Sequence, residues 1–198
     1  RLDDSWHMFT LLYLHGFNSS PNSKKAKLTK EWFARSAPNV DFLCPVIPPF
    51  AIAAMDMLER EIALIGDRTV QLVGSSMGGF FATNLIEKYG MRGVLVNPAV
   101  KPARGMTSLL GKNKNFEGTD LRTFDTCHID EYRDITCEEI ENKSNYLVLL
   151  QCDDEVLDYR DAAEYYAGCK TIIEQGGDHS FTNYQNYLED IYHFLFEE

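Results

Sequence analysis

A serine within a glycine-rich pentapeptide is the residue of this chain best suited to covalent chemistry. Residues 74–78 read Gly-Ser-Ser-Met-Gly and match G-x-S-x-G, with Ser76 at the centre. An apolar, β-prone run at 70–73 precedes the motif, and a stretch of helical character follows it as far as Gly90. A serine on a tight turn between a strand and a helix is a nucleophile elbow, whose glycines are expected to permit the turn and to keep side chains away from the hydroxyl. A simple small-residue turn before a helix would fit the same five residues.

A serine hydroxyl becomes a useful nucleophile only with a base to take its proton and a carboxylate to orient that base. His179 follows the last predicted strand, at 170–174, in a glycine-rich segment. Asp154 follows the preceding predicted strand, at 146–150. The chain order Ser76, Asp154, His179 is the order of an α/β-hydrolase triad. Taken singly, these could be a solvated histidine and a surface carboxylate, but together with the elbow they favour a triad.

Three other acidic residues compete with Asp154 for the role of the triad acid. Asp154 is preferred to Asp153 because Asp-x-Val directly after a strand resembles the acid loop of these hydrolases. Asp158 is expected to cap the helix that follows it. Asp178 adjoins His179 and is expected to point elsewhere, because neighbouring loop side chains diverge.

The first predicted strand, at 11–14, leads into a His-Gly pair where hydrolases place an oxyanion loop. Gly16 permits a turn after which the backbone N–H of Phe17 can point at a developing oxyanion. The N–H of Met77, directly after the candidate nucleophile, is the second expected donor. An ordinary strand-to-helix loop would also fit residues 15–20.

The composition indicates one globular domain and excludes several classes of partner. The 198 residues are 44% hydrophobic and 25% charged, with a net charge of −11 that argues against nucleic acid and anionic membrane surfaces. No run of 18 apolar residues predicts a membrane span, and the first ten residues do not resemble a signal peptide. The five cysteines are widely spaced without C-x-x-C, so we expect free thiols and a cytoplasmic protein. No metal or cofactor is expected, since no second histidine accompanies the acidic cluster at 153–155.

Strands alternating with helices predict an α/β fold: a mostly parallel sheet of about six strands with helices on both faces. Residues 1–7 fit nothing that follows and are interpreted as a vector remnant or a frayed extension, with Met8 as a possible natural start. Residues 8–198 then form a single domain. Its strands are expected at 11–14, 40–44, 70–73, 93–97, 146–150 and 170–174.

The alternation stops between 98 and 145, which we interpret as a cap or lid with short helices over Ser76. Leu109, Leu110 and Phe116 are expected to line an acyl pocket together with Met106, although simple packing of this segment on the core is an equal alternative. Two further patterns lie outside it. A capping box formed by Thr182 and Gln185 predicts the start of the last helix, and Lys24, Lys25, Lys27 and Lys30 predict a solvated basic helix face.

Five stretches make the chain resemble the small bacterial α/β-hydrolase esterases of the YqiA (UPF0227) family. They are Leu-Leu-Tyr-Leu-His-Gly-Phe-Asn-Ser-Ser-Pro at 11–21, Val-Gly-Ser-Ser-Met-Gly-Gly at 73–79, Val-Asn-Pro-Ala-Val at 96–100, Asp-Glu-Val-Leu-Asp-Tyr-Arg at 154–160 and Gly-Gly-Asp-His-Ser-Phe at 176–181. The resemblance covers nearly everything after residue 8. It implies an abbreviated α/β-hydrolase fold and a serine esterase acting on short acyl esters or thioesters, with Ser76, Asp154 and His179 as triad. The family commonly has a neutral residue where this chain has Asp178, which would place a second negative charge near the base.

The same triad supports several reactions, so the chemistry stays open at this point. An acyl-CoA thioesterase, a peptidase and a carbon–carbon hydrolase would use the same three residues. A non-enzymatic binding protein with a hydrolase fold is the alternative from another class, although it would not need an intact elbow. The expected partner is a small-molecule acyl ester or thioester.

Overall fold

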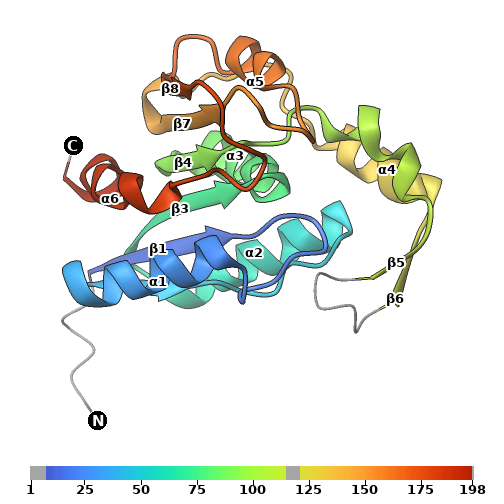
Figure 1. The fold of residues 1–198 in the computed structure, drawn as a ribbon. Helices are drawn as coiled ribbons and strands as arrows, with labels where there is room; N and C mark the ends of the chain where they lie inside the picture. Colours follow the sequence, from blue (N-terminus) through green and yellow to red (C-terminus); the bar gives the residue numbers. More distant parts are fainter. Residues whose placement is uncertain (1–7, 115–120, 198) are drawn as a thin grey trace.

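Six parallel strands form the central sheet of the computed structural model, which describes residues 8–114 and 121–197. Their spatial order is β2-β1-β3-β4-β7-β8, and every neighbouring pair is parallel (Figure 1). The predicted fold class is confirmed, and the predicted extension 1–7 lies outside the described residues. The strands are β1 (Phe9–Leu14), β2 (Val40–Leu43), β3 (Thr69–Ser75), β4 (Gly93–Val96), β7 (Tyr146–Gln151) and β8 (Lys170–Glu174).

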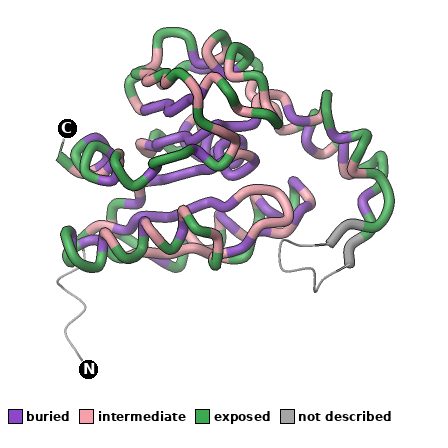
Figure 2. Tube along the Cα trace, viewed as in Figure 1, coloured by how far each residue is buried: buried purple, intermediate pink, exposed green. Residues whose placement is uncertain are grey.

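Helices cover both faces of the sheet because its strands are apolar on both sides. Leu12 and Leu14 of β1 pack with one set of helices, whereas Leu11 and Tyr13 pack with the other. Figure 2 shows the resulting buried central strands and the exposed outer surfaces of the helices. One face carries α2 (Ala51–Ile65), α3 (Met77–Tyr89) and α5 (Tyr159–Tyr165), and the other carries α1 (Lys24–Ser36) and α6 (Leu188–Phe196).

The chain order along the sheet changes direction between β1 and β3. The connection from β1 runs to β2 on one side, and the later strands continue on the other side of β3. Ligands of open α/β sheets bind beyond the carboxyl ends of strands at such a switch point. The loop after β1 and the turn after β3 therefore meet where a site is expected.

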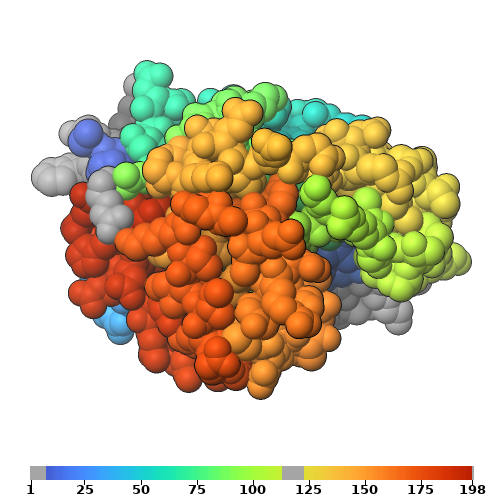
Figure 3. All heavy atoms as spheres, turned by 90° about the horizontal axis from the view of Figure 1, so that it is seen from above, coloured from blue at the N-terminus to red at the C-terminus, as the bar shows by residue number. Residues whose placement is uncertain are grey.

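The segment between β4 and β7 leaves the sheet and lies along one side of the molecule, beside the α5 region (Figure 3). It includes an antiparallel strand pair that the sequence did not predict. Gly-Lys-Asn-Lys at 111–114 has no apolar, β-branched or aromatic residue, so no strand pattern marks it. The segment contains η2 (Pro102–Leu109), β5 (Gly111–Lys114), β6 (Leu121–Phe124), α4 (Thr126–Asp134) and η3 (Lys143–Asn145).

The predicted start of the last helix is wrong. Thr182 caps no helix, because its backbone N–H donates to the Gln151 side chain at 2.8 Å. The chain then passes through Asn183, with φ 62°, into the 3₁₀ turn η4 (Tyr184–Tyr187), and α6 begins only at Leu188. A tertiary hydrogen bond thus takes the group that a local capping box would use.

Two further findings concern membrane spans and cysteines. Within residues 8–114 and 121–197, no helix combines the length and apolar character needed to cross a bilayer. All five cysteines are unpaired.

Candidate active site

Ser76 occupies the turn between β3 and α3 with a strained backbone. Its φ of 56° and ψ of −119° lie outside the regions that residues with a Cβ normally occupy. The residue stands directly before α3, whose first residue is Met77. The elbow geometry predicted from G-x-S-x-G is therefore present, and it brings the hydroxyl to the carboxyl edge of the sheet.

The glycines of this motif serve close packing, not an unusual backbone. Gly74 and Gly78 do not have positive φ. A Cβ on Gly78 would lie 1.9 Å from the carbonyl oxygen of Leu14, and one on Gly74 would lie 2.5 Å from the carbonyl oxygen of Gly78. The expectation that glycines supply the turn itself is corrected: Ser76 carries the strain, and the glycines let β1, β3 and α3 approach one another.

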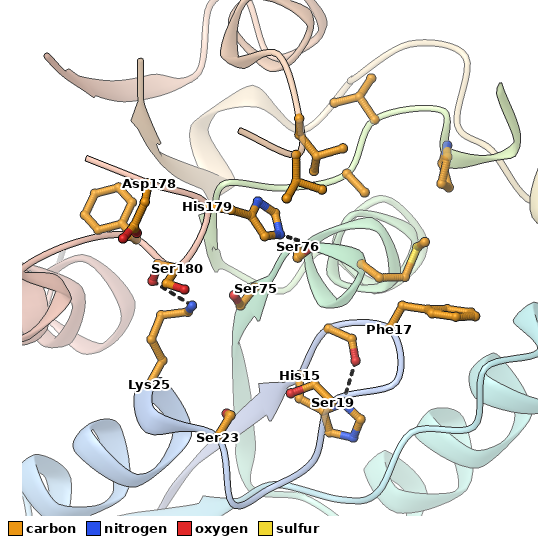
Figure 4. A pocket seen from close by; sticks show the side chains of 18 of the residues that line it. His15, Phe17, Ser19, Ser23, Lys25, Ser75, Ser76, Asp178, His179 and Ser180 are labelled. Carbon is orange, nitrogen blue, oxygen red and sulfur yellow. Dashed lines mark hydrogen bonds between the residues drawn. The ribbon is translucent and has the colours of Figure 1, made fainter. Parts of the chain in front are cut away.

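Three side chains from distant parts of the sequence form a hydrogen-bonded chain. The Oγ of Ser76 lies 3.0 Å from Nε2 of His179 (Figure 4). The Nδ1 of the same imidazole lies 2.9 Å and 2.8 Å from the two carboxylate oxygens of Asp154. Since an ionised carboxylate only accepts, Nδ1–H donates to Asp154 and Nε2 is left to accept from the serine hydroxyl. This is the arrangement that activates a serine as nucleophile.

Asp154 is held rigidly, whereas its competitors lie elsewhere. Its side chain is only 2% exposed, and its Oδ1 also accepts the backbone N–H groups of Val156 and Leu157, both at 2.9 Å. Asp153 is exposed. Asp158 caps α5, as expected, by accepting the N–H of Arg160. Asp154 is thus the carboxylate that contacts the imidazole.

Two buried amides, which the sequence reasoning did not single out, hold the loop that carries His179. Asn97, after β4, donates from Nδ2 to the backbone oxygens of Asp178 at 3.0 Å and His179 at 3.2 Å. Gln151, at the end of β7, accepts the N–H groups of Asp178 and Thr182 at Oε1. Their signal in the sequence is a polar residue at the carboxyl end of an apolar strand.

The carboxylate of Glu155, next to Asp154 in the chain, also contacts the loop that carries His179. Glu155 accepts the backbone N–H of His179 at Oε2, 2.9 Å away. Its pKa is lowered by backbone hydrogen bonds, its own first and then that of His179. The N–H and the C=O of His179 therefore both have protein partners, and the imidazole is left to Ser76 and Asp154.

The loop after β1 lies against the nucleophile and is fixed by a buried histidine. A Cβ on Gly16 would lie 3.4 Å from the Cβ of Ser76. His15 accepts the N–H of Ile47 at Nε2, 2.9 Å away, so its Nδ1–H donates to the Gly16 oxygen at 2.8 Å. Because peptide units are planar and the chain has no cis peptide bonds among its described residues, the Phe17 N–H points opposite to that oxygen, away from His15.

The N–H of Met77 is the second donor expected for an oxyanion. It belongs to the first residue of α3, and the first N–H groups of an α-helix have no partner within the helix. Both Phe17 and Met77 line the same cavity as Ser76. The two residues predicted as oxyanion donors therefore share a cavity with Ser76.

A cavity of about 1400 Å³ contains Ser76 and His179. Of the residues expected to line an acyl pocket, Leu109 and Met106 do so. Leu110 is 40% exposed and is not part of the cavity wall, and Phe116 lies outside the described residues. Other apolar side chains of the wall are Phe17, Val156, Leu157 and Tyr165. In the part of the chain that the structure describes, no three His, Cys, Asp or Glu side chains are grouped as metal ligands would be.

The sequence as a whole matches one protein family. The profile of the Uncharacterised protein family (UPF0227) matches residues 10–196. The chain belongs to this family. A UPF0227 protein of Serratia proteamaculans is 26% identical over 193 residues, which cover 91% of this chain and 96% of that protein. A UPF0227 protein of Yersinia pseudotuberculosis is 25% identical over 185 residues, with the same coverage.

Solved structures share the fold of this UPF0227 chain. Est1E from Butyrivibrio proteoclasticus, with ferulic acid bound, has a TM-score of 0.71 and 14% identity, covering 94% of this chain and 87% of Est1E. Mouse alpha/beta hydrolase domain-containing protein 10 has a TM-score of 0.72 and 14% identity, covering 91% and 88%. The UPF0227 chain therefore has the α/β-hydrolase fold.

Proposed function

We propose that the protein is a serine hydrolase that cleaves small carboxylic esters or thioesters through a covalent acyl-enzyme. The observation that carries this proposal is the continuous contact from Ser76 through His179 to Asp154 at hydrogen-bond distances, with Ser76 and His179 lining a cavity. A binding protein would have no use for a strained serine in contact with an oriented imidazole. The Pyrococcus furiosus esterase Pf2001, which has the same fold, adds support for this reaction class.

The reaction follows from the roles of the three side chains. Ser76 attacks the substrate carbonyl carbon while His179 takes the hydroxyl proton at Nε2, and Asp154 stabilises the imidazolium. The N–H groups of Phe17 and Met77 stabilise the oxyanion of the tetrahedral intermediate. His179 then protonates the leaving alcohol or thiol, and a water molecule releases the acyl group from Ser76 by the same steps.

The polypeptide segment 98–145 is proposed to select the acyl chain. Its η2 segment places Met106 and Leu109 in the cavity wall. It also packs on the oxyanion loop, where the rings of Phe124 and Phe17 meet edge to face with centroids 5.7 Å apart. A lid that contacts both the cavity and the oxyanion loop can couple substrate shape to catalysis.

We further propose that the protein works in a reducing cytoplasm. All five thiols are free, which is typical of proteins in that compartment. Burial raises the pKa of Cys44 to about 12 and that of Cys169 to about 11, so both remain protonated at neutral pH. Neither thiol is then a competing nucleophile to Ser76.

Hydrolysis of p-nitrophenyl acetate and butyrate by wild type and three variants tests the proposal. Ser76→Ala should lower kcat by several orders of magnitude, as removal of a triad nucleophile does. Asp154→Asn should also lower kcat strongly, because the imidazole loses its orienting acceptor. The matched control is Asp153→Asn, an exposed neighbour, which should keep wild-type turnover. Near-wild-type hydrolysis by folded Ser76→Ala would contradict the proposal.

A further inference from the structure

One lysine of the first helix enters the catalytic cavity instead of facing solvent. The sequence predicted a solvated basic face on α1, but Lys25 is half-buried and its side chain lines the cavity wall (Figure 4). Its ammonium group donates to the backbone oxygen of Ser180 at 2.8 Å, across 155 residues of sequence. The residue that accepts this bond directly follows His179. Lys25 therefore joins α1 to the loop that carries the proposed base.

Side chains from other elements also hold that loop. Asn97 and Gln151 hold it from the sheet, and Glu155 holds the N–H of His179. Its backbone is unusual, since Gly176, Gly177 and Phe181 all have positive φ. Asn97, Gln151 and Glu155 bond the backbone of Asp178 and His179, whereas the backbone oxygen of Ser180 accepts from a charged side chain of α1. Loss of that bond removes the link between α1 and the residue that follows His179.

Three acidic residues contact or adjoin His179. Asp154 contacts Nδ1, Glu155 accepts the backbone N–H of His179, and Asp178 precedes it in the chain. Asp178 has a buried carboxylate oxygen without a hydrogen-bond partner among the described residues. The charged groups farther along the cavity wall are Lys24, Lys101, Arg104, Asp158, Asp161 and Glu164, and its phenols are those of Tyr13, Tyr165 and Tyr184.

Two of the charged groups farther along the wall, Lys101 and Asp158, are paired with other residues. Lys25 instead interacts with Asp178 and Asp154. Lys101 pairs with Glu138 at 2.9 Å, and Asp158 pairs with Arg160 at 2.7 Å. Burial lowers the pKa of Lys25, and attraction to Asp178 and Asp154 counteracts that lowering. The ammonium group therefore acts on the same carboxylates that act on the imidazole.

We propose that Lys25 is a positioning residue of the reaction, which holds the His179 loop in place and offsets the carboxylates around the imidazole. This inference rests on the proposed function of Ser76 and His179. A general base must be unprotonated at the working pH. Nearby negative charges favour the protonated imidazole, and a nearby positive charge opposes them.

The fold does not depend on this lysine. Farther along α1, Thr29 bonds the hydroxyl of Tyr184 at 2.9 Å, and Phe33 packs on Tyr192 with ring centroids 6.1 Å apart. These contacts keep α1 on the C-terminal segment when the ammonium group is removed. Lys25→Met keeps the length of the side chain and deletes its charge, so this variant should fold normally.

The test compares pH profiles of kcat/KM for p-nitrophenyl butyrate. Lys25→Met removes a positive charge, so the imidazole should protonate more readily and the acid limb should move to higher pH, by on the order of half a pH unit. At the pH optimum, kcat should fall roughly tenfold as the loop loses its charged hydrogen bond. Asp178→Asn removes a negative charge and should move the acid limb the other way.

Two variants separate this role from a structural one. Lys25→Arg keeps the charge and a donor, so its acid limb should return to the wild-type position. Lys27→Met deletes an exposed lysine of the same helix outside the cavity, and its profile should match wild type. An acid limb of Lys25→Met that coincides with that of Lys27→Met, or that Lys25→Arg does not restore, would overturn the proposal. Failure of the proposed function would show separately, as absence of hydrolysis by wild type.

Discussion

His15 determines the direction of the peptide unit that follows Gly16. Its two ring nitrogens are both engaged, one accepting from Ile47 and the other donating to the Gly16 oxygen. This pairing requires the neutral tautomer with the proton on Nδ1. A single buried side chain, 2% exposed, thus orients the Phe17 N–H that is proposed to meet the oxyanion.

Replacement of His15 by alanine should lower kcat and leave KM nearly unchanged. The oxyanion donor acts mainly in the transition state, and misplacing one such donor costs about 10²-fold or more in kcat. Michaelis–Menten kinetics with p-nitrophenyl butyrate measure the two constants. The matched control is His193→Ala, which removes an exposed imidazole of α6 that pairs with Glu197 and does not line the cavity. A raised KM with intact kcat would refute this role of His15.

Whether a residue of the site could be predicted from the sequence depends on how that residue acts. Ser76, Asp154 and His179 stand in recognisable positions after strands, and the structure brings them together. Lys25 could not be distinguished from its exposed neighbours, because the rotation of a helix against a loop of distant sequence decides which lysine points inward. Asn97 and Gln151 act through backbone groups of a loop whose path no local pattern gives.

Among the elements, β1, β3 and α3 approach one another so closely that only glycine fits between them. The hypothetical Cβ of Gly78 would lie 1.9 Å from the Leu14 oxygen, which is backbone and cannot move aside cheaply. The same contact positions the oxyanion loop beside the elbow. The glycine that allows this close packing therefore also sets the geometry of the site.

Gly78→Ala should destabilise the fold severely, by more than about 3 kcal/mol, because the backbone must shift to admit the methyl group. Gly105→Ala is the matched control. A Cβ there meets nothing within 4 Å, so the change should stay within about 0.5 kcal/mol of wild type. Urea unfolding followed by circular dichroism measures both free energies of unfolding. Similar values for the two variants would show that the close approach is not needed.

The segment from Pro102 to Leu109 offers a test of the proposed lid. Leu109 lines the cavity, whereas Leu110 next to it is exposed. Leu109→Ala should therefore lower kcat/KM more for octanoate than for acetate, since each buried methylene contributes roughly 0.8 kcal/mol. Leu110→Ala should leave the chain-length series unchanged. A uniform loss across acetate, butyrate and octanoate for Leu109→Ala would indicate a role in folding or catalytic geometry instead.

The strands of the central sheet were easier to predict than the elements of the segment between β4 and β7. Buried parallel strands consist of continuous apolar runs, such as 146–150, which are visible without tertiary information. The β5–β6 pair has no such run: β5 reads Gly-Lys-Asn-Lys, and Phe124 at the end of β6 is a single buried residue after Leu-Arg-Thr. The boundary of α6 was wrong because Gln151, a residue of another strand, took the Thr182 N–H.

At the scale of the whole molecule, the parallel sheet is what gathers the reactive groups. Each proposed catalytic residue follows a different strand, and all carboxyl ends of parallel strands lie at the same edge. Ser76 and His179 are thereby brought together across 103 residues, and His179 and Asp154 across 25. The strand order could be inferred from the fold class. The size and lining of the cavity could not be inferred, because they depend on the segment between β4 and β7.

The most direct test of the account is labelling with a fluorophosphonate probe, followed by intact mass and peptide mapping. A serine activated by His179 and Asp154 should react with one equivalent of probe, and the adduct should map to Ser76. Ser76→Ala should remain unlabelled, and His179→Gln should react far more slowly because the hydroxyl keeps its proton. Folded wild-type protein that stays unlabelled, or an adduct on a residue other than Ser76, would contradict the account.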